Sequence, residues 1–174
     1  MLARAAIATA VDTPSPARDA TIDDNLPILD ERRGAFVTIS LRERLRGCIG
    51  RIEADQPLRT LIPEMARAAA LADPRFPAVR ADEVHKLVIE LSLLSPLEPV
   101  VDLATIEVGR HGLVVAARGR RGLLLPQVAL QNGWSREEFL TETCLKAYLP
   151  ATAWRDEGVR IYAFTAEVFA EGDE

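Results

Sequence analysis

Apolar residues recur along this chain with a helical period in some segments and in strict alternation in others. Between residues 57 and 72 they fall three or four positions apart, which is the spacing of an amphipathic helix. Pro57 suits the first turn of that helix, and Pro74 ends it because a residue before proline is pushed out of the α region. Further helices are predicted over residues 2–11, 84–87, 126–132 and 136–146, the last opened by a capping box at Ser135 and Glu138.

Alternating segments predict strands. Residues 36–41 and 45–49 are typical of a hairpin, and residues 88–94 place three apolar side chains on one face with Glu90 and Ser92 on the other. The remaining strand-like segments are residues 106–108, 113–117, 122–125 and 160–169. Strands joined by hairpins and interrupted by helices predict an α+β fold with antiparallel or mixed sheets flanked by helices.

The chain has 174 residues, which suits one ordinary domain or one domain with two small lobes. Apolar residues make up 48% of it, and no run approaches the ~18 to 20 apolar residues that span a bilayer. Its first residues lack the pattern of a secretory signal. We therefore expect a cytoplasmic protein.

One hexapeptide, residues 45–50, carries more chemical information than any other segment. It reads Leu45-Arg46-Gly47-Cys48-Ile49-Gly50, a thiol between two glycines and near an arginine. Glycine lacks a Cβ, which lets backbone or ligand approach closely, and neighbouring guanidinium groups favour the thiolate over the thiol. As a strand, the segment would place Cys48 on one side with Arg42, Arg44 and Arg46, and Leu45 and Ile49 on the other. The alternative is a cysteine buried as a small hydrophobe.

The overall charge narrows the choice of ligand. A net charge of −5 and a pI near 5.2 argue against generic nucleic-acid binding. Positive charge is nevertheless concentrated near the thiol, which favours a small anionic ligand; the arginines are Arg32, Arg33, Arg42, Arg44, Arg46 and Arg51. The two cysteines, Cys48 and Cys144, form no CxxC or Cys/His cluster, so we expect no disulfide, no metal site and no cofactor.

Three further residues are candidates for the same site, each with a structural alternative. His111 is either a general base or a structural turn residue. Arg75 either pairs with Asp73 or faces the pocket of Cys48. Glu90 interrupts an apolar strand and either pairs with a cation such as Arg46 or faces solvent.

Much of the chain resembles the AMMECR-type family, named after the Alport syndrome, mental retardation, midface hypoplasia and elliptocytosis chromosomal region. The similarity covers residues 34–169 in order and spacing, with a weaker one over residues 2–7. It is carried by Gly34-Ala35-Phe36-Val37-Thr38, Leu45 to Gly50, Pro57-Leu58, Asp73-Pro74-Arg75-Phe76, Ile89-Glu90-Leu91-Ser92, Leu94-Ser95-Pro96, Gly109-Arg110-His111-Gly112-Leu113, Leu125-Pro126-Gln127-Val128-Ala129, Gly133-Trp134, Phe139-Leu140, Cys144, Lys146-Ala147 and Trp154. It departs from the pattern at Arg42-Glu43 and at Tyr148, where the family commonly has glycine.

The resemblance implies a fold of two closely packed lobes. We accordingly expect an N-terminal helix and proline-containing linker over residues 1–33, an AMMECR-type domain over 34–169 and a tail over 170–174. The biochemical role of the family is largely unassigned. Its bacterial and archaeal members are often encoded beside MEMO-like and radical SAM proteins, which implies a shared pathway or complex.

Three hypotheses follow. In the first, a small anionic molecule binds around Cys48, with Cys48 and His111 as catalytic residues and Arg44, Arg46, Gly47, Gly50, Arg75 and Glu90 as binding residues. In the second, the chain is a non-enzymatic scaffold that docks a MEMO-like or radical SAM protein. In the third, the same thiol is a redox sensor. Neither the residues nor the resemblance decides whether the chain is an enzyme.

Overall fold

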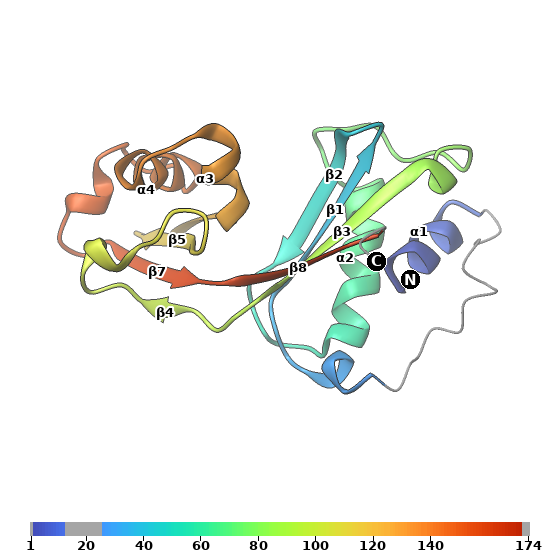
Figure 1. The fold of residues 1–174 in the computed structure, drawn as a ribbon, viewed down its shortest axis with the longest axis horizontal. Coiled ribbons are helices and arrows are strands. Elements are labelled where there is room, and N and C mark those ends of the chain that lie inside the picture. Colours follow the sequence, from blue (N-terminus) through green and yellow to red (C-terminus); the bar gives the residue numbers. More distant parts are fainter. Residues whose placement is uncertain (1, 13–25, 172–174) are drawn as a thin grey trace. The chain divides into compact units, whose positions relative to one another are not determined.

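The computed structural model describes residues 2–12 and 26–171, which form two compact units (Figure 1). The first unit contains the described residues up to Leu94 and from Glu167 onward, and the second is Ser95–Ala166. The domain limits expected after residues 33 and 169 stay predictions. The predicted linker prolines Pro14 and Pro16 lie outside the described residues.

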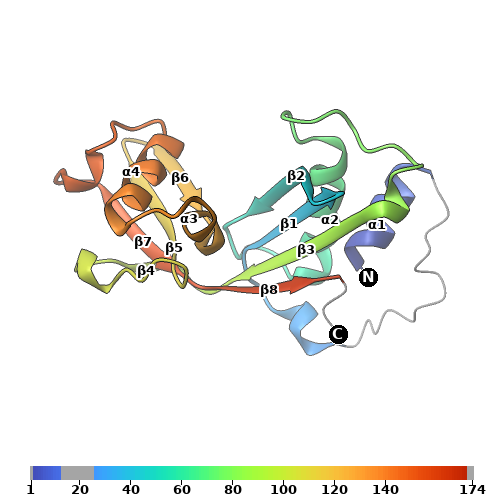
Figure 2. The same cartoon turned by 45° about the horizontal axis from the view of Figure 1, so that its top comes forward.

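The first unit is built on a four-stranded sheet in the order β2-β1-β3-β8. Its strands are β1 (Ala35–Leu41), β2 (Arg44–Arg51), β3 (Leu87–Leu94) and β8 (Ala166–Ala170). Helix α2 (Leu58–Leu71) packs on β1 and β2, and α1 (Leu2–Ala10) packs on α2 (Figure 2). Apolar side chains from both helices and one sheet face form the core, among them Ile7, Val37, Ile39, Leu61, Met65 and Ile89. Two 3₁₀ turns, Pro27–Asp30 and Val84–Lys86, complete this unit.

The β1–β2 hairpin contains a bulge that changes which side chains share a face. Val37 pairs with Ile49 and Thr38 with Cys48, but Ser40 pairs with Leu45, so Arg46 is the extra residue. Because paired residues point to the same face, Leu45 lies on the face of Cys48 and opposite to Ile49. The prediction that Leu45 and Ile49 share a side is therefore wrong. Arg44 pairs with Leu41 and therefore lies on the face opposite to Cys48. The prediction that Arg44 and Cys48 share a side is also wrong.

The second unit has a four-stranded sheet in the order β4-β7-β5-β6. Its strands are β4 (Glu98–Pro99), β5 (Gly112–Ala117), β6 (Arg120–Leu124) and β7 (Arg160–Phe164). Its helices are α3 (Pro126–Asn132), α4 (Arg136–Lys146) and the 3₁₀ turns Leu103–Thr105 and Ala153–Arg155. Leu113, Val115, Phe139, Leu140 and Cys144 belong to its separate core. Two antiparallel sheets with flanking helices confirm the predicted α+β class.

Several predicted elements are confirmed and two are wrong. The capping box at Ser135 and Glu138 opens α4 as expected. The strand predicted at residues 106–108 is absent, since among the described residues Val108 makes only an isolated bridge to His111. The strand predicted over residues 160–169 is two strands in different sheets. Between them, the Thr165 N–H donates to Ser95 Oγ and the Thr165 carbonyl accepts the Ser95 N–H, so Thr165 takes no part in strand pairing.

In the parts of the chain that the structure describes, the helices are all too short or too polar to traverse a bilayer.

Candidate functional site

Cys48 lies in β2, an edge strand of the first sheet, and it is partly exposed. Thr38 of β1 is its cross-strand partner. The Thr38 hydroxyl donates a hydrogen bond to Cys48 Sγ over 3.3 Å. This hydrogen bond fixes where the sulfur lies on the sheet face.

Two side chains from the loop after α2 form hydrogen bonds with the backbone N–H and carbonyl of Cys48 at the outer edge of β2. The Cys48 N–H donates to Asp73 Oδ2 at 2.9 Å, and Arg75 Nη2 donates to the Cys48 carbonyl at 3.1 Å. The Asp73 carboxylate and the Arg75 guanidinium thus make the hydrogen bonds that a neighbouring strand would make in the middle of a sheet. Together they hold the backbone that carries the thiol.

Asp73 and Arg75 are themselves a bidentate ion pair. Arg75 Nε lies 2.9 Å from Asp73 Oδ1, and Arg75 Nη2 lies 2.7 Å from Asp73 Oδ2. This hydrogen bonding holds the pKa of Asp73 far below its usual range, although burial opposes the shift. The pair with Asp73, more than the proximity of Cys48, raises the pKa of Arg75. The Asp73 side chain is 2% exposed and that of Arg75 is 51% exposed, so the acid is a fixed anchor and the guanidinium faces solvent.

Arg46 has a different set of partners. Its guanidinium makes an ion pair with Glu83 at 3.0 Å and donates to the carbonyls of Pro77 and Ala78. Only 12% of the Arg46 side chain is exposed. The carboxylate that binds Arg46 is therefore Glu83 and not Glu90, which was one of the predicted alternatives. Arg75, rather than Arg46, is the guanidinium that contacts Cys48.

The model of the AMMECR1 family matches residues 1–169. The chain belongs to the AMMECR1 family. It is 45% identical over 157 residues to a protein of Methanothermobacter thermautotrophicus, covering 86% of this chain and 82% of that one. It is 44% identical over 152 residues to a protein of Methanocaldococcus jannaschii, covering 83% of this chain and 76% of that one.

The fold is also similar to that of a solved structure. The crystal structure of an uncharacterized protein from Pyrococcus horikoshii matches with a TM-score of 0.89 at 41% identity. The match covers 98% of this chain and 88% of that chain. The predicted AMMECR-type membership and α+β fold are thereby confirmed.

The two glycines of this AMMECR1 motif have packing partners. A Cβ on Gly47 would lie 2.1 Å from the Ala69 carbonyl oxygen of α2, and one on Gly50 would lie 2.2 Å from the ring of Phe36. Gly47 therefore lets the edge strand approach the helix, and Gly50 makes room for an aromatic ring. Their predicted role in ligand binding stays a prediction.

Among the other predicted residues, one belongs to the second unit and the rest belong to the first. His111 is in the second unit, where its Nδ1 accepts the Glu107 N–H at 3.0 Å and closes a turn. Arg44 lines an open hollow of about 570 Å³ at the hairpin end, together with Leu41, Arg42, Leu45 and Arg46. Glu90 lies on β3 opposite Thr38, so the sheet register gives a row Cys48–Thr38–Glu90. His85 is an exposed residue.

Thr38 is the site residue that the sequence did not single out. Its place in the hairpin could have indicated that it pairs with a residue near Cys48. The bulge at Arg46, however, shifts the register by one residue, so counting back from the turn gives the wrong partner. Within residues 2–12 and 26–171, no group of three or more His, Cys, Asp or Glu side chains is arranged to hold a metal ion.

Proposed function

We propose that Cys48 and Arg75 form a binding site for a small anionic molecule, with Cys48 Sγ presented to it as a nucleophile. The observation that carries the proposal is the hydrogen bond from Arg75 Nη2 to the Cys48 carbonyl, which keeps a half-exposed guanidinium beside the thiol. The pair with buried Asp73 fixes the direction of that guanidinium. A fixed cation next to a reactive sulfur favours anionic substrates.

Arg75 retains hydrogen-bonding capacity for a ligand. Its Nε and Nη2 atoms serve Asp73 and Cys48. Its Nη1 group makes no hydrogen bond to any residue that the structure describes. A carboxylate or phosphate oxygen bound at Nη1 would complete the donor set of the guanidinium. A cytoplasmic location, as expected from the sequence, would keep Cys48 reduced.

A pair of alkylating reagents that differ in charge tests this proposal. Iodoacetate and iodoacetamide react with a thiolate in the same way: the S–CH₂ bond forms and iodide leaves. We expect the rate ratio of iodoacetate to iodoacetamide at Cys48 to exceed that of a free cysteine peptide. The ratio should fall about tenfold in Arg75→Gln, which removes one charge-assisted contact, and stay unchanged in Arg44→Gln.

The outcome is read by peptide mass mapping at several pH values, with buried Cys144 as the internal control. Arg75→Lys keeps the charge and should keep most of the iodoacetate preference, provided that circular dichroism shows a native fold. An inert Cys48, or a ratio equal to that of the free peptide, would refute the proposal.

A second candidate function is docking of another protein, and one observation favours it. Leu45 and Val88 both pair with Ser40, so the exposed side chains of Leu45 (43%) and Val88 (48%) flank Ser40 on the face that carries Cys48. The family resemblance suggests a MEMO-like or radical SAM protein as the partner. Cys48→Ala should then leave co-purification of that partner intact, whereas Val88→Asp should abolish it. Loss of co-purification in Cys48→Ala, together with normal co-purification in Val88→Asp, would instead favour the site at the thiol.

A further inference from the structure

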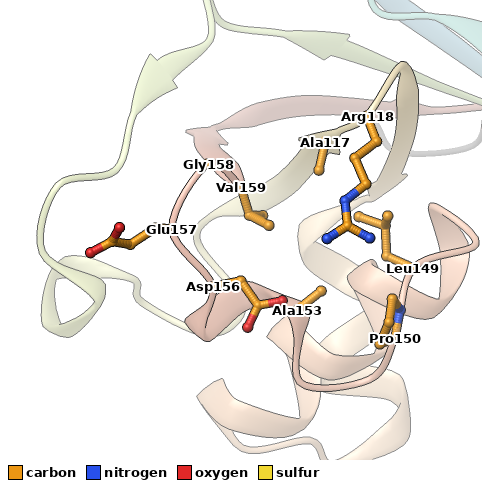
Figure 3. A pocket seen from close by; sticks show the side chains of 9 residues that line it. All are labelled: Ala117, Arg118, Leu149, Pro150, Ala153, Asp156, Glu157, Gly158 and Val159. Atoms are coloured by element: carbon orange, nitrogen blue, oxygen red, sulfur yellow. The ribbon is translucent and has the colours of Figure 1, made fainter.

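The second unit contains a cavity of about 170 Å³ beside the end of β5 (Figure 3). It lies among the end of β5, the turn after α4, and residues 153–159 before β7. All its lining residues belong to the second unit. The cavity is smaller than a typical drug-sized pocket of roughly 300 to 1,000 Å³, which favours a ligand of few atoms.

The cavity combines an apolar lining with two opposite charges. Ala117, Leu149, Ala153 and Val159 supply the apolar part, and Leu149 and Ala153 are buried. Arg118 and Asp156 also line the cavity, while the side chain of Glu157 points away from it in Figure 3. An apolar hollow with a cation and an anion around it matches an amphipathic ligand.

Neither Arg118 nor Asp156 pairs with another side chain that the structure describes. Within the described residues, the Arg118 guanidinium and the Asp156 carboxylate make no hydrogen bond or ion pair. Other arginines nearby do have partners: Arg155 binds Glu137, and Arg120 donates to the Tyr148 carbonyl. Arg118 and Asp156 thus have their full bonding capacity free for a ligand.

The backbone at Arg118 adds a second observation. Arg118 and Gly119 form the turn between β5 and β6, and Arg118 has a φ of 53°. Asparagine or glycine adopts this left-handed conformation at lower cost than arginine. An arginine at this position is costly for the turn itself, and its side chain reaches the cavity.

We propose that this cavity binds a small zwitterion, an α-amino acid with a short aliphatic side chain. Its carboxylate would bind Arg118, its ammonium group would bind Asp156, and its side chain would contact Leu149 and Val159. A simple anion would be repelled by Asp156 and a simple amine by Arg118. A neutral apolar molecule would desolvate both charges without pairing them.

The test is a titration of the full ¹⁵N-labelled chain with L-valine, followed by amide chemical shifts. We expect saturable shifts at residues 117–118 and 153–159. Isovalerate lacks the ammonium group and isobutylamine lacks the carboxylate, so both should bind about tenfold or more weakly, since each loses one charge-assisted contact. L-Alanine and L-leucine test the size of the cavity.

Two variants and one matched control locate the contacts. Arg118→Asn removes the guanidinium and suits the left-handed turn, and Asp156→Asn removes the carboxylate; each should weaken L-valine binding about tenfold or more. Glu157→Gln removes an adjacent carboxylate that points away and should leave binding within about twofold. The proposal is overturned if no aliphatic amino acid gives saturable shifts, if isovalerate binds as well as L-valine, or if both variants bind L-valine like the native chain.

Discussion

Asp73 accepts the backbone N–H of Cys48 at 2.9 Å, across 25 positions of sequence. The same carboxylate orients Arg75, which donates to the Cys48 carbonyl. Asp73 therefore acts on the thiol site in two ways, through the strand and through the guanidinium. This links the Asp-Pro-Arg-Phe segment to the cysteine motif, and it makes the two candidate roles of Arg75 compatible.

Asp73→Asn should destabilise the protein by about 2 to 4 kcal/mol at pH 7, because it breaks a buried charge-assisted network. The pKa of Asp73 is lower in the folded chain than the roughly 3.9 of a free aspartate. A lowered folded-state pKa contributes stability that is complete above about pH 4 and is lost as the pH falls below it. The gap between the native chain and the variant should therefore narrow in acid. Urea unfolding at pH 7 and at pH 3 measures both effects.

Asp82→Asn is the matched control, since Asp82 forms an exposed ion pair with Arg80. It should change stability little, because exposed pairs contribute little. A loss at Asp73 no larger than the loss at Asp82 would show that the carboxylate is not an anchor.

The parts of the fold that the sequence predicts are those controlled by local chemistry. The stripe of α2, the capping box of α4 and the left-handed Gly133 after α3 each depend on residues a few positions apart. The break at Thr165 was not predictable in the same way, because the apolar alternation continues through it. The interruption between β7 and β8 is marked by the two hydrogen bonds between Thr165 and Ser95, which lie far apart in the sequence.

The candidate site was harder to predict because it depends on a one-residue shift. A two-residue turn at Arg42-Glu43 without a bulge would place Gly47 opposite Thr38; the bulge places Cys48 there instead. The contacts of Arg46 with Glu83 and of Cys48 with Asp73 join distant segments. No local pattern encodes such contacts, so the sequence identified the thiol and Arg75 but not Thr38, which donates to the sulfur.

Gly47→Ala should cost about 2 to 3 kcal/mol in unfolding free energy. Its Cβ would lie 2.1 Å from the Ala69 carbonyl oxygen, and a helix backbone cannot move aside cheaply. Chemical denaturation measures the loss. Ser40→Ala changes a partly exposed position of the adjacent strand without a clash and serves as the control. A Gly47→Ala protein of native stability would mean that β2 and α2 are farther apart than described.

Thr38→Val should slow the reaction of Cys48 with iodoacetamide at pH 7 by about two- to tenfold. Valine keeps the shape of threonine but removes the hydroxyl that donates to Sγ at 3.3 Å, and one such hydrogen bond contributes about 0.5 to 1.5 kcal/mol. Without this donor, no hydrogen bond from Thr38 fixes the position of Sγ on the sheet face. Peptide mass mapping with Cys144 as the internal control gives the rate. An unchanged rate, with the fold intact, would remove Thr38 from the site.

Tyr148 ends α4 in a conformation that suits glycine. Its φ is 56°, and the helix closes with a Schellman pair in which Leu149 N–H bonds the Cys144 carbonyl and Tyr148 N–H bonds the Leu145 carbonyl. Its side chain is 82% exposed, so little packing offsets the backbone cost. The turn residues Arg42 and Glu43 also have positive φ values, of 51° and 61°.

Tyr148→Gly should therefore raise the free energy of unfolding by about 0.5 to 1 kcal/mol, since glycine adopts the left-handed region without a Cβ clash. Tyr148→Ala is the matched control: it removes the same aromatic ring but keeps the Cβ, so it should give no gain. Urea unfolding of the three proteins separates the two contributions. Equal stabilities of the glycine and alanine variants would show that the ring, and not the backbone conformation, determines the stability at this position.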